Sequence, residues 1–302
     1  MTRKSLDGWV SKIIPMDLSF DGLSQEDIDG ALLKHDAVPL LFGRITAETL
    51  VEDLRRTGAE EALAERGYSD LRAEVASLPM DQEGLEITAA HPDAPERVRL
   101  MELKAFWGHL PLPEGSQNAT CRALIWDWLE LRDPLASFPA DRPPLPGQTA
   151  PGLAMFHGLV EQMRKYVALT EAEALVTIPQ HFHNAVLYKK DPALGYRFLE
   201  PLRRGQMSAQ MRDLLVPLGF YASTWAFAEN RVEMLEPDKD PQDPGNWVGF
   251  AWTPSELVLP LTPWVKEALN RRMPEVEYGE QCRFRARATP HPDIEGSFHL
   301  AS

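Results

Sequence analysis

The sequence predicts an α/β protein in which helices flank a mixed, mostly antiparallel sheet. Three observations lead to this prediction. Helical and extended hydrophobic periods follow one another along the chain, a continuous apolar run occupies residues 121–131, and the composition is that of a globular protein. Of the 302 residues, 44% are hydrophobic and 25% are charged, so the chain is able to bury a sizeable core. Its length suits one large domain or two modest ones.

Helical patterns come first in the chain. Ser24 is a good helix start, because an apolar stripe at helical spacing follows it. Thr46 predicts the start of a second helix that runs through Leu54 and is broken at Gly58. A short third helix is expected over residues 60–66.

The hydrophobic period then changes to that of strands. Apolar and polar residues alternate over 71–76, and 85–87 forms a short second strand. Residues 97–107 predict a long third strand, whose apolar face shifts near Met101 as a β-bulge would cause. The run at 121–131 is apolar on both faces, so we expect a central strand with helices on either side.

Asp127 interrupts that apolar run. A buried carboxylate needs a hydrogen-bonding partner. Two interpretations therefore stay open, in which Asp127 is either a structural residue or a site residue.

After a proline-rich connection, the period is again helical. Pro151 is placed for the first position of a helix that continues to residue 168. A strand at 174–178, a helix at 181–190 and a strand at 195–199 are expected next. Further along we expect helices at 208–215 and 262–272, and extended segments at 219–227, 231–235, 247–252 and 280–287.

Charge and composition exclude several classes of function. The net charge of −14 argues against nucleic-acid binding, which needs clustered Lys and Arg, and it is compatible with a cationic substrate. Two cysteines do not form a disulfide framework or a zinc ribbon. Neither a signal peptide nor an apolar run of 18 residues is present, so we expect no membrane partner and a cytoplasmic location.

Three sequence features between residues 116 and 200 are similar to those of a known family. The first is a Pro/Gly turn with Gln148, Gly152 and Ala154. The second is the strand at 174–178, and the third is Asn184-Ala-Val-Leu-Tyr188-Lys-Lys, followed by Gly195-Tyr196. Together with the order strand, turn, helix, strand, helix and strand, this region resembles the core of the GCN5-related N-acetyltransferases. The resemblance covers about a quarter of the chain.

The resemblance implies acetyl-CoA or another acyl-CoA as cofactor. The start of the helix after Pro151 would offer free backbone N–H groups and the positive end of the helix dipole to a pyrophosphate. The turn itself contains no Arg or Lys, and Arg142, Arg203 and Arg204 are the candidates to approach it. The residues expected to bind the cofactor are Gln148, Gly152, Leu153, Ala154, Met155 and Asn184.

The resemblance also implies roles in acyl transfer. Tyr188 would return a proton to the leaving thiolate. A carboxylate or a chain of water molecules would deprotonate the amine of the acceptor, and Asp127 and Glu130 are the candidate carboxylates. The acceptor would be a small molecule or a basic protein surface.

The expected organisation has three parts. Residues 1–115 form a helical and β-meander portion, 116–200 the acyltransferase-like core, and 201–302 a C-terminal extension. That extension would cover the cleft or form a contact in a homo-oligomer.

Two other functions remain open. The first is a metal site at His157, His181 and His183, completed by Asp127 or Glu200, although no metal is expected. On a helix, residues two apart point away from each other, so His181 and His183 converge only if they precede the helix proper. The second is a non-catalytic binding or assembly protein, for which the eight tryptophans would supply interface side chains.

Overall fold

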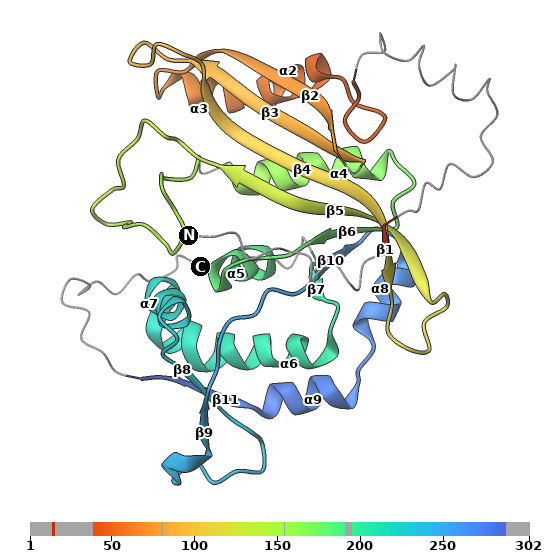
Figure 1. Ribbon diagram of the computed structural model, residues 1–302, viewed down its shortest axis with the longest axis vertical. Helices are drawn as coiled ribbons and strands as arrows, with labels where there is room; N and C mark the ends of the chain where they lie inside the picture. Colours follow the sequence, from red (N-terminus) through yellow and green to blue (C-terminus); the bar gives the residue numbers. More distant parts are fainter. Residues whose placement is uncertain (1–13, 16–38, 80, 154, 191–194, 288–302) are drawn as a thin grey trace. The chain divides into compact units, whose positions relative to one another are not determined.

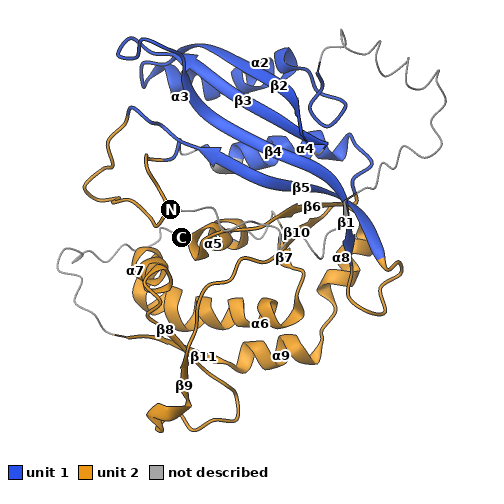
Figure 2. Cartoon of the chain, in the orientation of Figure 1, with its two compact units in different colours: residues 1–111, 120–135, 152–172 blue, residues 112–119, 136–151, 173–302 orange. Residues whose placement is uncertain are grey.

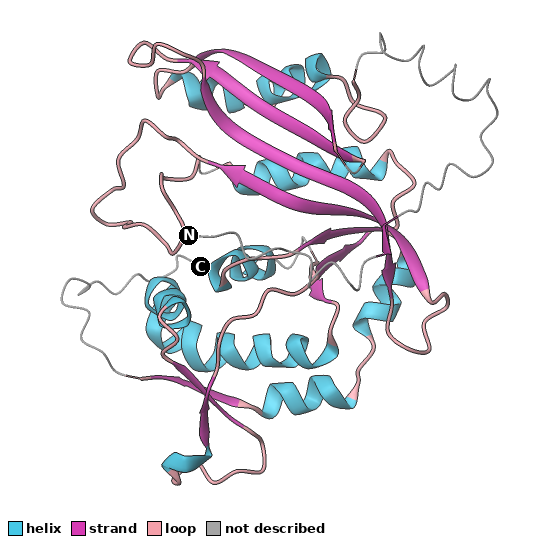
Figure 3. Cartoon of the chain, in the orientation of Figure 1, coloured by secondary structure: helices cyan, strands magenta, loops and turns pink. Residues whose placement is uncertain are grey.

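The computed structural model describes residues 14–15, 39–79, 81–153, 155–190 and 195–287 (Figure 1). The chain is mixed α/β, with a large, mostly antiparallel sheet flanked by helices, which confirms the predicted fold class (Figure 3). Three expectations lie outside the described residues, namely the helix at Ser24, the cofactor contact of Ala154 and the side chain of His157.

The chain divides into two compact units (Figure 2). Unit 1 contains residues 1–111, 120–135 and 152–172, and unit 2 contains residues 112–119, 136–151 and 173–302. The segment expected as one acyltransferase-like core, 116–200, is thus shared between the two units.

The described residues of unit 1 form antiparallel strands with three helices on one face (Figure 1). Its helices are α2 (Ala47–Arg56), α3 (Ala59–Ala64) and α4 (Phe156–Ala168). Its strands are β1 (Ile14–Pro15), β2 (Ser69–Leu78), β3 (Gln82–Ala90), β4 (Val98–Pro111) and β5 (Thr120–Leu131). Strand β3 pairs with β2 and β4, and β4 also pairs with β5 and β1.

Local sequence explains several of these elements. The Thr46 hydroxyl accepts a hydrogen bond from the Thr49 amide at 3.2 Å, which caps α2 as predicted. Leu71 and Val75 are buried in β2 while Arg72 and Glu74 are exposed, as a half-buried strand requires.

The described ladders of unit 1 have a register shift between Ser69 and Arg72 of β2, and two further β-bulges lie on either side of β4. Between β3 and β4, Ile87 pairs with Met101 and Thr88 pairs with Arg99, so Leu100 has no partner in this ladder. This confirms the bulge predicted near Met101. Between β4 and β5, Lys104 pairs with Trp128 and Ala105 pairs with Trp126, which leaves Asp127 as the extra residue of a second bulge.

The two faces of these strands differ in chemistry. Ile87, Met101 and Leu131 are cross-strand neighbours on the face toward the helices. Glu86, Glu102 and Glu130 form the matching row on the other face, and Arg99 lies within 3.5, 3.5 and 3.8 Å of them. This arginine relieves the repulsion that three carboxylates side by side would otherwise cause.

Unit 2 contains two smaller groups of strands and five α-helices among its described residues. In the first group, β10 (Leu257–Pro260) lies between β6 (Ala174–Thr177) and β7 (Arg197–Phe198) and is antiparallel to both. In the second, β8 (Val232–Leu235) lies between β9 (Trp247–Gly249) and β11 (Arg283–Ala286). The helices are α5 (Phe182–Lys190), α6 (Pro201–Gln210), α7 (Val216–Ala228), α8 (Pro263–Asn270) and α9 (Pro274–Gln281), with a π-helical segment (Met211–Leu215) joining α6 to α7.

Helices α6 and α9 cross at two glycines. A Cβ atom built on Gly205 would lie 2.1 Å from the carbonyl oxygen of Val276, and one on Gly279 would lie 2.6 Å from that of Leu202. No side chain fits in either place. The glycines therefore allow the two backbones to touch.

Two predicted elements were wrong. Residues 219–227 were expected to be extended but lie within α7, where buried residues such as Ala226 and Phe227 pack as part of a helix, so tertiary packing overrides their strand propensity. Pro151 does not begin a helix, because α4 starts at Phe156 after Met155 as N-cap. A hydrogen bond from Arg66 to the Leu153 carbonyl oxygen instead holds the segment before α4.

Candidate functional site

The backbone at Gly152 lies open in the segment that leads into α4. Gly152 is exposed, and a Cβ atom placed there would meet nothing nearer than the Leu131 carbonyl oxygen, at 3.8 Å. The neighbouring Leu153, by contrast, is buried. The buried side chain of Leu153 thus anchors the segment, while the peptide group of Gly152 stays accessible.

Arg66 brings a positive charge to the same segment. Its Nη2 donates a hydrogen bond to the Leu153 carbonyl oxygen at 3.1 Å, and its Nη1 lies 3.6 Å from Asp133 Oδ2. Arg66 lies just after α3, 87 residues away from Leu153 in the chain. Sequence reasoning missed this residue, because a contact over that separation leaves no local signal.

The N-terminus of α4 adds to this positive field. The helix is 13 residues long, and its N-cap, Met155, contributes no side-chain hydrogen bond. The N–H groups of the first turn are thus not capped by that residue, and the helix dipole places a partial positive charge at this end. Gly152, Arg66 and the start of α4 together make a region suited to an anion.

An apolar cavity lies beside this region, between the strands and the helices of unit 1. Its volume is about 320 Å³. Leu153, Met155 and Leu159 line it from α4 and the preceding segment, Leu131 lines it from β5, and the turn between α2 and α3 lines it through Gly58 and neighbouring residues. The cavity falls within the size range of small-molecule sites.

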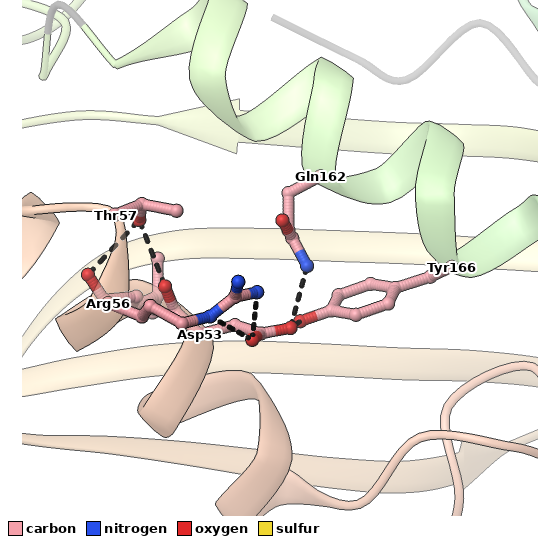
Figure 4. Close-up of polar contacts among 6 residues, drawn as sticks. Asp53, Arg56, Thr57, Gln162 and Tyr166 are labelled. Atoms are coloured by element: carbon pink, nitrogen blue, oxygen red, sulfur yellow. Dashed lines mark hydrogen bonds and ion pairs between the residues drawn. The ribbon is translucent and has the colours of Figure 1, made fainter.

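A polar cluster holds α2 against α4 at this cavity (Figure 4). The Asp53 carboxylate accepts hydrogen bonds from Gln162 Nε2 at 2.7 Å, from the Tyr166 hydroxyl at 2.6 Å and from Arg56 Nη2 at 2.8 Å. The Tyr166 hydrogen bond is the main cause that lowers the pKa of Asp53; burial opposes it, and Arg56 adds to the lowering. Asp53 is therefore ionised at neutral pH.

The predicted proton donor, Tyr188, lies in unit 2 on α5. Its side chain is buried, its hydroxyl is hydrogen-bonded to the side chain of Thr177, and its ring centroid lies 4.8 Å from that of Tyr196. Burial raises the pKa of Tyr188 to about 12. The hydroxyl thus keeps its proton at neutral pH.

His181 and His183 stack, with ring centroids 5.3 Å apart and ring planes 8° apart. Only His181 precedes α5, which begins at Phe182, and His183 lies in its first turn. The two rings thus meet although the condition set out from the sequence, that both precede the helix, is not fulfilled. Burial and the neighbouring His181 lower the pKa of His183 to about 3, and burial also lowers the pKa of His181. Both rings are neutral at pH 7. Among the residues with described placement, no group of three or more His, Cys, Asp or Glu side chains is arranged to hold a metal ion.

Lys189 is a second titratable group that sequence reasoning missed. Its Nζ lies 3.5 Å from the Tyr196 carbonyl oxygen. Burial, together with the charges of Arg197 and Arg204, lowers the pKa of Lys189 to about 8. Arg204 donates hydrogen bonds to the carbonyl oxygens of Phe198 and Arg271, so its guanidinium links two backbone segments of unit 2.

The sequence-predicted site residues are shared between the units. Gly152, Leu153, Met155 and Asp127 belong to unit 1. Gln148, Asn184 and Tyr188 belong to unit 2. The carboxamide oxygen of Gln148 accepts a hydrogen bond from the Leu145 amide at 2.9 Å, and the side chain of Asn184 is hydrogen-bonded to His183.

The two candidate bases differ in their surroundings. Asp127 is half-buried at the bulge of β5, rather than fully buried as the apolar run suggested. Glu130 takes part in ion pairs with Arg99 at 3.8 Å and Arg132 at 3.6 Å. Asp127, unlike Glu130, forms no ion pair with another residue whose placement is described.

Within the part of the chain that the structure describes, no helix is long and apolar enough to cross a membrane.

Comparison with known proteins identifies no relative of this chain. No protein-family model matches the chain, and neither the curated proteins nor the solved structures contain a significant match.

Proposed function

We propose that this protein is an acyl-CoA-dependent N-acyltransferase related to the GCN5-related family. The observation that carries the proposal is the open backbone of Gly152 beside the Arg66 guanidinium and the N-terminus of α4. Support also comes from the element order β5, α4, β6, α5 and β7, which is the order that the resemblance implies.

The anionic part of the cofactor would bind in this region of unit 1. A pyrophosphate needs donors and positive charge, and peptide N–H groups with one arginine provide both. Gly152 matters because a side chain at this position would stand where the phosphate oxygens approach. Arg66 supplies the cation that the turn itself lacks.

The transfer reaction requires two proton movements. The amine nitrogen of the acceptor attacks the thioester carbonyl carbon, the C–S bond breaks, the amine loses a proton and the thiolate gains one. Tyr188 keeps its proton at neutral pH and is our candidate to donate it. Asp127 is our candidate to accept the proton of the amine.

The acceptor would be an amine, either on a small molecule or on a basic protein. A protonated amine is attracted to a protein with a net charge of −14, and this long-range attraction raises the rate of encounter.

The test is a thermal-shift series with CoA, acetyl-CoA and longer acyl-CoA. A ligand that binds only the native state raises its melting temperature. We expect a rise with each CoA species and its loss in Gly152→Glu, in which a carboxylate replaces the room for phosphate.

Gly249→Glu is the matched control. It introduces the same charge at an exposed glycine whose added Cβ atom would also meet no close atom. The proposal is wrong if no CoA species shifts the melting temperature of the wild-type protein, or if the two variants lose the shift equally.

A further inference from the structure

At the cavity of unit 1 lies a buried hydrogen-bond acceptor to which no described residue donates. The Gln162 Oε1 atom is buried and finds no hydrogen-bond partner among the described residues. Gln162 lines the cavity, whose other lining side chains are almost all apolar. A buried acceptor without a donor is unfavourable, so the site is incomplete without a molecule that donates to it.

The orientation of this amide is determined by its other end. Gln162 Nε2 donates to Asp53 Oδ2 at 2.7 Å, and an ionised carboxylate accepts hydrogen bonds but cannot donate them. The amide nitrogen must therefore face Asp53, and the oxygen must face away. Figure 4 shows the oxygen turned away from Asp53 and Tyr166, to the side on which Thr57, another lining residue, lies.

The dimensions of the cavity suit an aliphatic chain. An engineered cavity of about 150 Å³ holds benzene with its six carbon atoms, so about 320 Å³ suits roughly ten to twelve carbons. Leu131, Leu153 and Met155 line the cavity next to Gly152, and Gln162 lies roughly 10 Å further along α4. A chain that enters beside Gly152 would thus place its distal part at Gln162.

We infer that this cavity binds a medium-chain aliphatic acyl group with a hydroxyl near its distal end. The hydroxyl would donate to Gln162 Oε1, and the methylene groups would pack against the leucines of the strands and of α4. This inference rests on the proposed function and extends it, because it names the acyl group of the acyl-CoA donor.

Calorimetric titration of the full chain with two free acids tests the inference without CoA. The probes are decanoic acid and 10-hydroxydecanoic acid. We expect both to bind, and the hydroxy acid to bind about tenfold more tightly, since it alone satisfies the buried acceptor. In Gln162→Met this preference should disappear while decanoic acid still binds.

Two variants that fill the cavity complete the test. Gly158→Leu and Ala62→Leu each add a side chain at a lining position, and a Cβ atom on Gly158 would meet no atom within 4 Å. We expect each to lose at least tenfold in affinity for both acids. Gly249→Leu, at an exposed glycine of β9, is the control and should bind as the wild-type protein does.

The outcomes separate this inference from the proposed function. Absence of binding by either acid, equal affinity for both, or binding that survives both filling variants would each overturn the acyl-group assignment. If CoA raises the melting temperature while the acids do not bind, the assignment alone fails. If the acids bind as expected while no CoA species does, acyl transfer fails and the site is one for a free hydroxylated fatty acid.

Discussion

Two helical glycines of this protein, Gly205 in α6 and Gly158 in α4, have opposite surroundings. At the crossing of α6 and α9, Gly205 lies so close to Val276 that an added methyl group would overlap the backbone. In α4, a methyl group on Gly158 would meet no atom within 4 Å, and a cavity lies beside it. One glycine removes volume so that two backbones touch. The other leaves volume unfilled next to an open peptide and an arginine.

The difference indicates where the fold is fully packed and where it is not. Protein interiors are normally close-packed, and an unfilled apolar space weakens the contacts of the atoms around it. The cavity lies beside the region that is suited to an anion, which favours a role in binding over a role in stability.

Gly205→Ala should be the most damaging change. The new methyl group would displace Val276 and force α6 and α9 apart, and overpacking of this kind costs about 1–3 kcal/mol or more in the free energy of unfolding. Urea unfolding of the variant and the wild-type protein measures the loss. A change below about 0.5 kcal/mol would contradict the tight crossing.

Asp53→Asn should lower the free energy of unfolding at pH 7 by about 1–3 kcal/mol, because Tyr166 and Gln162 lose a charged acceptor. The folded protein lowers the pKa of Asp53. Its stabilising effect is thus complete above about pH 4, the usual pKa of an unfolded aspartate, and is lost as the pH falls through the folded-state pKa.

Urea titrations at pH 7, 5 and 3 check this prediction. The gap between the wild-type protein and Asp53→Asn should stay constant from pH 7 to 5 and shrink toward pH 3. A gap that widens on acidification would show that the sign is wrong. The cluster would then not hold α2 against α4 through an ionised carboxylate.

Gly158→Ala should have the smallest effect, and of the opposite sign. Alanine favours the helix over glycine by about 0.5–1 kcal/mol, and at this position it meets no steric obstacle. Thermal unfolding should show a small rise in the melting temperature. If the variant is destabilised as Gly205→Ala is, the space beside α4 is not open and the contrast fails.

Local patterns were sufficient for most elements of the fold. The cap at Thr46, the alternation in β2 and the bulge near Met101 were all visible in the chain, because each depends on residues a few positions apart. Residues 219–227 were mistaken for a strand, since aromatic and β-branched residues suit both a strand and the buried face of α7.

The candidate site likewise combines features that local sequence predicts with features that depend on long-range contacts. The sequence by itself determined the succession of strands and helices from β5 to β7 and marked Gly152 as a residue without a side chain at the start of the predicted helix, which the structure begins at Phe156. Only the tertiary structure decided that Arg66 meets Leu153 across 87 residues, that Asp53 orients Gln162 across 109, and that a cavity remains between them. Such contacts arise when distant segments pack on a common sheet face. The residues next to each partner in the sequence do not indicate which distant segment it will meet.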